Sequence, residues 1–333
     1  MNPPSLWQVL ARSWERFWFA PGSATPGSAL NLAVARIVFA SSSLWVLVSR
    51  NFSGISALPG DFWGAVPTSL SWRFLDFGGH PTRELVLEWI AGAALVSAII
   101  GVLPRLSCFC AGILLYHLAP LESIIWTNSP YARGLTISVL ALLTLSFSRC
   151  GDCCIFFPLH RSMATDRDAD TWAIRLIQVF IAQIYFFSGY SKVVYAGWKW
   201  ASASNLRNWL LYFNEAPQTL VFHSLGLWIA ARPTLCGIIG AATLALELAF
   251  PLVLFSKAAR RVLVPLVAIF HLGILLSMNL VFLNVPQLLV FADWNWLKER
   301  WGGIRLVETH VELPGPLYEA EPSPHQSLRS RIG

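Results

Sequence analysis

The chain has 333 residues, of which 55% are hydrophobic and only 13% are charged. A soluble domain usually carries about 25% charged residues, so the composition argues against a soluble single-domain enzyme. It also argues against a disordered protein, which would need low hydrophobicity. The net charge is +6, but the basic residues are scattered between apolar runs. This scatter argues against a nucleic-acid-binding face.

The hydrophobic pattern predicts an all-α, polytopic transmembrane helical bundle. Apolar stretches about as long as a bilayer is thick recur from Ala29 to Phe291. We expect about seven membrane spans, within a range of six to eight. Their predicted bounds are 29–49, 86–103, 106–125, 134–148, 172–195, 234–255 and 262–283.

Three regions follow from these spans. Residues 1–28 are an N-terminal interfacial segment, in which Trp7 to Phe19 is expected to form an amphipathic helix on the membrane surface. Residues 29–295 are the transmembrane domain, and residues 296–333 are a polar, partly disordered tail.

Two segments between or after the spans are harder to place. Segment 196–233 has several Trp among polar residues and predicts interfacial helices. Segment 286–293 is too short to cross the membrane alone. It either re-enters the membrane or extends the seventh helix past Pro286.

Orientation rests on one short basic loop. Lys257, Arg260 and Arg261 lie close together there, and positive residues in short loops favour the cytoplasmic side. We therefore expect a multi-pass protein of the bacterial inner (cytoplasmic) membrane, with its N-terminus in the cytoplasm.

Several polar residues lie inside apolar runs, where each is costly and needs a partner or a role. For Arg36 and Glu247 the structural interpretation is an interhelical ion pair or hydrogen bond that fixes packing. Gln178 would form an interhelical hydrogen bond. His271 is either a satisfied buried histidine or a functional group, and Lys192 either extends to the interface or is a reactive amine.

The reactive interpretation of Lys192 depends on its context, SGYSKVVYAGW. A lysine in an apolar pocket loses its charge more readily, and a neutral amine is a competent base. Ser188 and Gly189 would let another backbone approach closely. Trp198 and Trp200 would cap the site at the membrane interface.

The run IRLIQVFIAQIYFFSGYSKVVYAGWKW, residues 174–200, resembles the fifth-span region of the HTTM membrane proteins. This group includes the vitamin K-dependent gamma-carboxylase. The shared features are Gln178, Tyr185, the pair Ser188–Gly189, Lys192 and Trp198.

Further pieces resemble this family in matching order. Arg36 lies in LAVARIVFA, and WTNSPYARGL (126–135) is similar to a loop of the carboxylase. Glu247 lies in LELAFPLVLF and His271 in AIFHLGILL, which resemble its sixth and seventh spans. The resemblance covers roughly 30–295.

The resemblance implies a membrane enzyme that acts on a quinol-like lipid or a membrane-presented peptide. In the carboxylase, the lysine that matches Lys192 is the base that deprotonates reduced vitamin K. The implied catalytic residues are Lys192 and His271, and the implied cofactor is a lipid quinol, with no metal expected. The implied substrate-binding residues are Asn128, Tyr131, Tyr185, Gln178 and Trp198.

One departure leads to a second hypothesis. Ser129 stands where the carboxylase loop has a histidine, which removes a group that could stabilise a reacting oxyanion. Glutamate carboxylation itself is therefore not the predicted reaction. The alternative is a non-catalytic maturation or assembly partner, for example of a secreted peptide. Expected partners are membrane lipids and a peptide or membrane protein.

A cysteine-rich loop offers a weaker motif. Cys150, Cys153 and Cys154 are followed by His160. A zinc site needs four ligands, and one histidine with a C-x2-C spacing falls short of that pattern. We interpret the three as loop thiols rather than metal ligands.

Overall fold

The computed structural model describes residues 6–19, 29–50, 52–59, 80–125, 134–155, 171–215, 223–282 and 285–301. All regular elements within these ranges are helices. The chain divides into two compact units, Met1–Asn295 and Trp296–Gly333. Helix α13, Trp294–Trp301, crosses from the first unit into the second.

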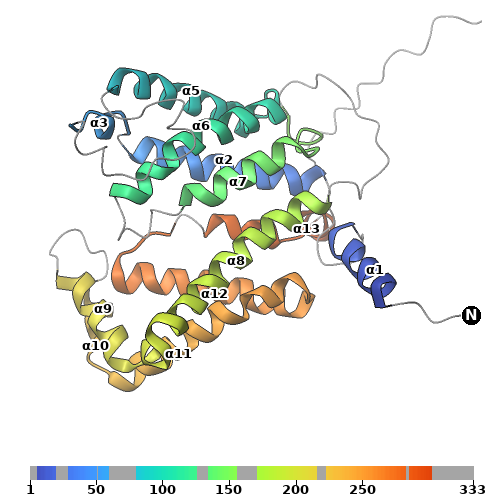
Figure 1. Cartoon of the computed structure of the whole chain (residues 1–333). Coiled ribbons are helices and arrows are strands. Elements are labelled where there is room, and N and C mark those ends of the chain that lie inside the picture. Colours follow the sequence, from blue (N-terminus) through green and yellow to red (C-terminus); the bar gives the residue numbers. More distant parts are fainter. Residues whose placement is uncertain are drawn as a thin grey trace, which may run out of the picture. The chain divides into compact units, whose positions relative to one another are not determined.

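A first group of helices is formed by the N-terminal half of the chain (Figure 1). Helices α2, α5, α6 and α7 pack against one another, and the short α3 packs on α5. The bounds are α2 Ala29–Ser49, α3 Phe52–Ser56, α5 Pro81–Ile100, α6 Pro104–Ile125 and α7 Gly134–Ser146. Helix α1, Leu6–Phe19, contacts α8 instead.

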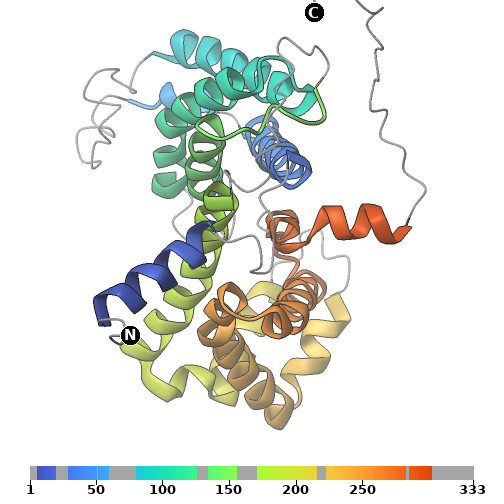
Figure 2. The same cartoon turned by 90° about the vertical axis from the view of Figure 1, so that its right-hand side faces the viewer.

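A second group begins with the long helix α8, as Figure 2 shows from the side. Helices α9 and α10 pack against each other, and both also contact α11 and α12. The bounds are α8 Thr171–Ala196, η2 Gly197–Ala201, α9 Ala203–Glu215, α10 His223–Ala230, α11 Pro233–Ala249, η3 Phe250–Leu254, α12 Lys257–Met278, η4 Pro286–Phe291 and α13 Trp294–Trp301.

The all-helical architecture confirms the predicted fold class at the level of an α-helical membrane bundle. Four stretches of the described chain are long and apolar enough to cross a membrane: Ala29–Ser49, Thr171–Ala201, Pro233–Leu254 and Lys257–Met278. Two shorter apolar helices are Pro104–Ala119 and Leu135–Ser146. Each of the seven predicted segments falls on a helix, but seven crossings stay a prediction.

The segment after α12 is a separate element. The helix ends at Met278, and Asn279 adopts the left-handed conformation that closes its last turn. Pro286–Phe291 then forms a 3-10 helix, η4, that packs on α2 and also contacts α8 and α12. The interpretation of this segment as an extension of the seventh helix is therefore wrong, because the chain turns before it.

Buried arginines bind the carbonyl groups of turns and helix ends. Arg36, which is fully buried, donates to the carbonyl oxygens of Cys150 and Cys154, at 2.6 Å each. Arg260 donates to the carbonyl oxygen of Val253 through Nη2, at 2.8 Å. In an apolar environment an unpaired carbonyl costs several kcal/mol (of the order of 2–7), so these contacts stabilise the turns between helices.

Candidate functional site

A cavity of about 580 Å³ lies between α8, α9, α11 and α12. Its volume is within the range of about 300–1,000 Å³ that small-molecule sites occupy. Its wall is mainly apolar and aromatic, and a few polar side chains from different helices interrupt it. This combination is typical of a ligand site rather than of a packing defect.

Lys192 and Glu247 form an ion pair on the wall of this cavity. The lysine Nζ contacts both carboxylate oxygens of Glu247 and also donates to Ser188 Oγ, at 3.1 Å. Ser188 in turn donates to Glu247 Oε1, at 3.2 Å. We call Ser188, Lys192 and Glu247 the Lys192 cluster. The side chain of Glu247 is 7% exposed and that of Lys192 is 21% exposed.

A glycine brings the two helices of this cluster together. A Cβ atom added to Gly189 on α8 would lie 3.0 Å from Glu247 Cβ and 3.1 Å from Leu248 Cγ on α11. Such contacts are tighter than normal packing, so a larger residue at this position would need its neighbours on α11 to move. The predicted close approach at Ser188–Gly189 is therefore seen, and its partner is the helix that carries Glu247.

A second polar pair faces the same cavity. Tyr185 Oη and His271 Nε2 are 2.8 Å apart, and each residue is only 7% exposed. Aromatic rings surround the pair: Phe250 lies 4.5 Å from the Tyr185 ring, and Phe282 lies 4.7 Å from the His271 ring, between centroids. The pair therefore places a hydrogen-bonding group in an aromatic wall.

Trp200 covers the lysine from the side of η2. Lys192 Nζ lies 4.6 Å from the centroid of the Trp200 ring, which is within cation–π distance. Asn205 of α9 fixes this element, because its Nδ2 donates to the Trp200 carbonyl oxygen at 2.8 Å.

Helix α9 forms one wall of the cavity with Trp209 and Phe213, whose rings stack at 5.8 Å. Its C-terminal part is attached to α12 by the buried Asn214. The Nδ2 of Asn214 donates to the carbonyl oxygens of Leu210 and Ser277, at 2.7 and 2.9 Å. The predicted interfacial segment is thus helical, and it helps to enclose the cavity.

The structure brings four of the predicted residues to one place: Tyr185, Lys192, Glu247 and His271. Gln178 is elsewhere, because its Nε2 donates to the Val290 carbonyl oxygen of η4, at 3.0 Å.

Trp198 and two loop residues do not help to define the site. Trp198 is 76% exposed and does not line the cavity, whereas its neighbour Trp200 does. Asn128 and Tyr131 lie outside the described residues.

Arg36 and Glu247, predicted as structural polar residues, have separate partners. Arg36 binds the loop carbonyls described above, and Glu247 binds Lys192. Sequence reasoning treated Glu247 and Lys192 separately and missed their contact, as well as Trp209 and Phe213. A signal for the contact was present in the glycine next to Ser188, which marked where a second helix could approach.

The cysteine loop holds its thiols close together. Cys153 and Cys154 Sγ atoms are 3.5 Å apart. The contact with Cys154, followed by burial, raises the pKa of the Cys153 thiol above its usual range. This favours the neutral thiol over the thiolate that binds metals. Within the described residues, no three His, Cys, Asp or Glu side chains are grouped to hold a metal ion; His160 lies outside those residues.

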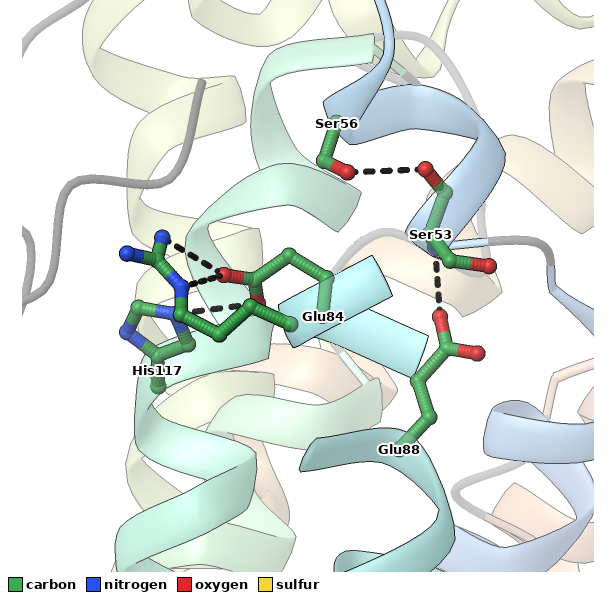
Figure 3. Close-up of polar contacts among 6 residues, drawn as sticks. Ser53, Ser56, Glu84, Glu88 and His117 are labelled. Atoms are coloured by element: carbon green, nitrogen blue, oxygen red, sulfur yellow. Dashed lines mark hydrogen bonds and ion pairs between the residues drawn. The ribbon is translucent and has the colours of Figure 1, made fainter. Parts of the chain in front are cut away.

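A second buried carboxylate lies in the first group of helices (Figure 3). Glu84 accepts from Arg83 Nη2 at 2.9 Å through Oε1, and its Oε2 lies 3.1 Å from His117 Nε2. We call Arg83, Glu84 and His117 the Glu84 cluster. Close by, Glu88 Oε1 accepts from the backbone N–H of Ser53 at 2.6 Å. These contacts join α3, α5 and α6.

Comparison with known proteins gives one match. A family model described as the HTTM domain matches residues 25–296, which is most of the chain. No curated protein and no solved structure matches the chain. Together with the apolar helices, the family match fits an integral membrane protein.

Proposed function

The chain belongs to the HTTM domain family, and from this premise we propose that it is a membrane enzyme of the gamma-carboxylase-like type acting on a quinol-like lipid. The lipid would bind in the cavity between α8, α9, α11 and α12. Lys192 would be the base, with Glu247 as its proton-exchange partner. The observation that carries the proposal is the Lys192–Glu247 contact on the wall of a large apolar cavity.

The cavity suits an aromatic ring with an apolar tail. Trp200, Trp209 and Phe213 supply flat apolar surfaces on one side, and aromatic rings prefer offset or edge-on contacts with such surfaces. Tyr185 and His271 supply a hydrogen-bonding group on another wall. A quinol combines these requirements, because it has a flat ring and a polar hydroxyl.

The Lys192 cluster can take a proton from the quinol hydroxyl. Lys192 first passes one proton to the carboxylate of Glu247 and becomes a neutral amine. This amine then accepts the hydroxyl proton, leaving a quinolate, an ammonium and a carboxylic acid. The ammonium stays beside the quinolate and stabilises its charge, because opposite charges attract strongly where water is excluded.

We also propose how the protein is placed in the membrane. All seven apolar helices would cross the membrane, with the N-terminus in the cytoplasm of a bacterium. The site then lies near the outer end of α8, where exposed aromatic residues such as Tyr190, Tyr195 and Trp198 suit the membrane–water interface.

Oxidation of a reduced short-chain naphthoquinol by O2 in proteoliposomes tests the proposal. A quinolate gives its electrons to O2 more readily than a neutral quinol, and each quinol loses two electrons and two protons as O2 becomes hydrogen peroxide. We expect wild-type protein to accelerate quinone formation and Lys192→Met to lower the rate by about 100-fold or more.

Lys199→Met is the matched control, because Lys199 is exposed on η2 and does not line the cavity. It should keep the wild-type rate. An unchanged rate in Lys192→Met would discard the enzymatic proposal. Lipid-free protein that co-purifies with one membrane protein would favour the assembly-partner hypothesis instead.

A further inference from the structure

The Lys192 ammonium already has hydrogen-bond partners within the protein. An ammonium has three N–H groups. The lysine Nζ contacts both oxygens of Glu247, which lie too close together for each to take a separate N–H group, and it also reaches Ser188 Oγ at 3.1 Å. The face of Trp200 covers the ammonium as well. An anionic ligand would therefore compete with the carboxylate of Glu247 for the Lys192 ammonium.

The charges on the cavity wall cancel. Lys192 and Glu247 are the only Lys, Arg, Asp or Glu side chains among the described residues that line it. The other polar groups include the Thr243 hydroxyl and the Asn205 amide, which carry no charge. Such groups can bind a hydroxyl but do not neutralise a carboxylate, a sulfate or a phosphate.

An anionic headgroup could pair with the positive charge of Lys192 only by displacing Glu247. That carboxylate is 7% exposed, so displacement would leave a buried charge without its partner, which is strongly unfavourable. A hydroxyl has no such requirement, since it can bind beside the intact ion pair.

We propose that Glu247 is a charge filter: it neutralises Lys192 and thereby reserves the cavity for an uncharged, hydroxyl-bearing amphiphile while excluding anionic lipids. This assignment deepens the proposed function and rests on its placement of the ligand in this cavity. Fatty acids and acidic phospholipids share the bilayer with the true ligand. A lone lysine in an apolar cavity would bind them, and the carboxylate prevents this.

Photolabelling with three amphiphiles of one chain tests the filter. The probes are hexadecanol, hexadecyl sulfate and hexadecyltrimethylammonium, each with a diazirine at the same carbon, in nanodiscs of phosphatidylcholine. Mass spectrometry compares labelling of the cavity residues Ile184 and Phe270 with that of Ile269, which is exposed on α12. The ratio of cavity labelling to Ile269 labelling corrects for differences in how much of each probe enters the membrane.

In wild-type protein, labelling of the cavity should favour hexadecanol over both charged probes by about 10-fold or more. This is the smallest effect that we expect from one charge–charge contact at a partly buried site. Glu247→Gln keeps the shape of the side chain and leaves Lys192 unneutralised. It should reverse the preference toward hexadecyl sulfate. Lys192→Met leaves Glu247 alone and should shift the preference toward hexadecyltrimethylammonium.

The double variant Lys192→Met/Glu247→Gln guards against a folding defect. It removes both charges, so it should again favour hexadecanol. Glu215→Gln is the matched control at an exposed glutamate of α9 and should behave as wild type. If Glu247→Gln folds and keeps the wild-type preference, or if wild-type protein prefers the sulfate, the charge filter is wrong.

The same experiment separates the two proposals. A wild-type protein that selects hexadecanol in the cavity but never accelerates quinol oxidation would overturn the enzyme and leave the filter standing. A protein that oxidises quinol while labelling its cavity equally with all three probes would overturn the filter alone.

Discussion

The Glu84 cluster and the Lys192 cluster contain the same kinds of side chain in different surroundings. In each, a buried glutamate from one helix binds a basic side chain from a neighbouring helix. Glu84 has a fully buried side chain, and both of its oxygens bind basic partners. Glu247 lies beside a cavity of about 580 Å³. We therefore expect a buried ion pair to mark a ligand site only where open space lies next to it.

The same substitution at both glutamates should give the largest difference. Glu84→Gln removes the charge between Arg83 and His117, and we expect it to lower the free energy of unfolding by about 3 kcal/mol. Glu247→Gln should cost less, because the Lys192 side chain that loses its partner is 21% exposed, whereas that of His117 is 4% exposed. Thermal denaturation in detergent measures the loss of stability of each variant relative to the wild type. A larger loss for Glu247→Gln would mean that the Lys192 cluster mainly holds helices together.

Glycines at helix contacts provide an intermediate test. Gly189→Ala forces α8 away from α11. Gly112→Ala places its Cβ atom 2.9 Å from Leu143 Cγ, which is too close for normal packing. Each should destabilise by about 1–3 kcal/mol. Only Gly189→Ala should also weaken hexadecanol labelling of the cavity. Equal ligand effects from both variants would show that the cavity responds to the whole bundle rather than to the α8–α11 contact.

The smallest effect is expected at two neighbouring tryptophans. Trp200→Leu removes the ring that faces Lys192, which is worth about 0.5–2 kcal/mol, so naphthoquinol should bind several-fold more weakly. Trp198→Leu changes a ring that is 76% exposed and should leave naphthoquinol affinity unchanged. Equilibrium binding of naphthoquinol to nanodiscs measures both. A stronger effect at Trp198 would place the ligand outside the cavity.

The helices could be predicted because hydrophobic length is a property of local sequence. The predicted span 29–49 coincides with α2, and 172–195 differs from α8 by one residue at each end. Charged residues in apolar runs also stand out, so Lys192, Glu247 and His271 could be selected without coordinates. Helices α5 and α7 differ from the four long apolar stretches, because α5 carries three charged residues and α7 has only 13 residues.

The pairing of these residues could not be predicted. Lys192 and Glu247 are 55 positions apart, and their contact depends on how α8 meets α11 at Gly189. The resemblance implies a substrate-binding role for Gln178, but its side chain donates to the Val290 carbonyl oxygen of η4. The resemblance implies Trp198 as the binding residue, but Trp200 lines the cavity instead. Both lie in the 3-10 helix η2, which has about 3.0 residues per turn and shifts each side chain relative to α-helical spacing.

The two asparagines of α9 have a thermodynamic consequence. Asn205 ties the start of this helix to η2, and Asn214 ties its end to α12, so the wall is in place before any ligand arrives. A ligand that meets a preorganised wall loses little affinity to ordering of the protein. Calorimetry of ligand binding should then show a negative heat-capacity change that is proportional to the apolar area of the ligand. Folding of α9 should add nothing to that change.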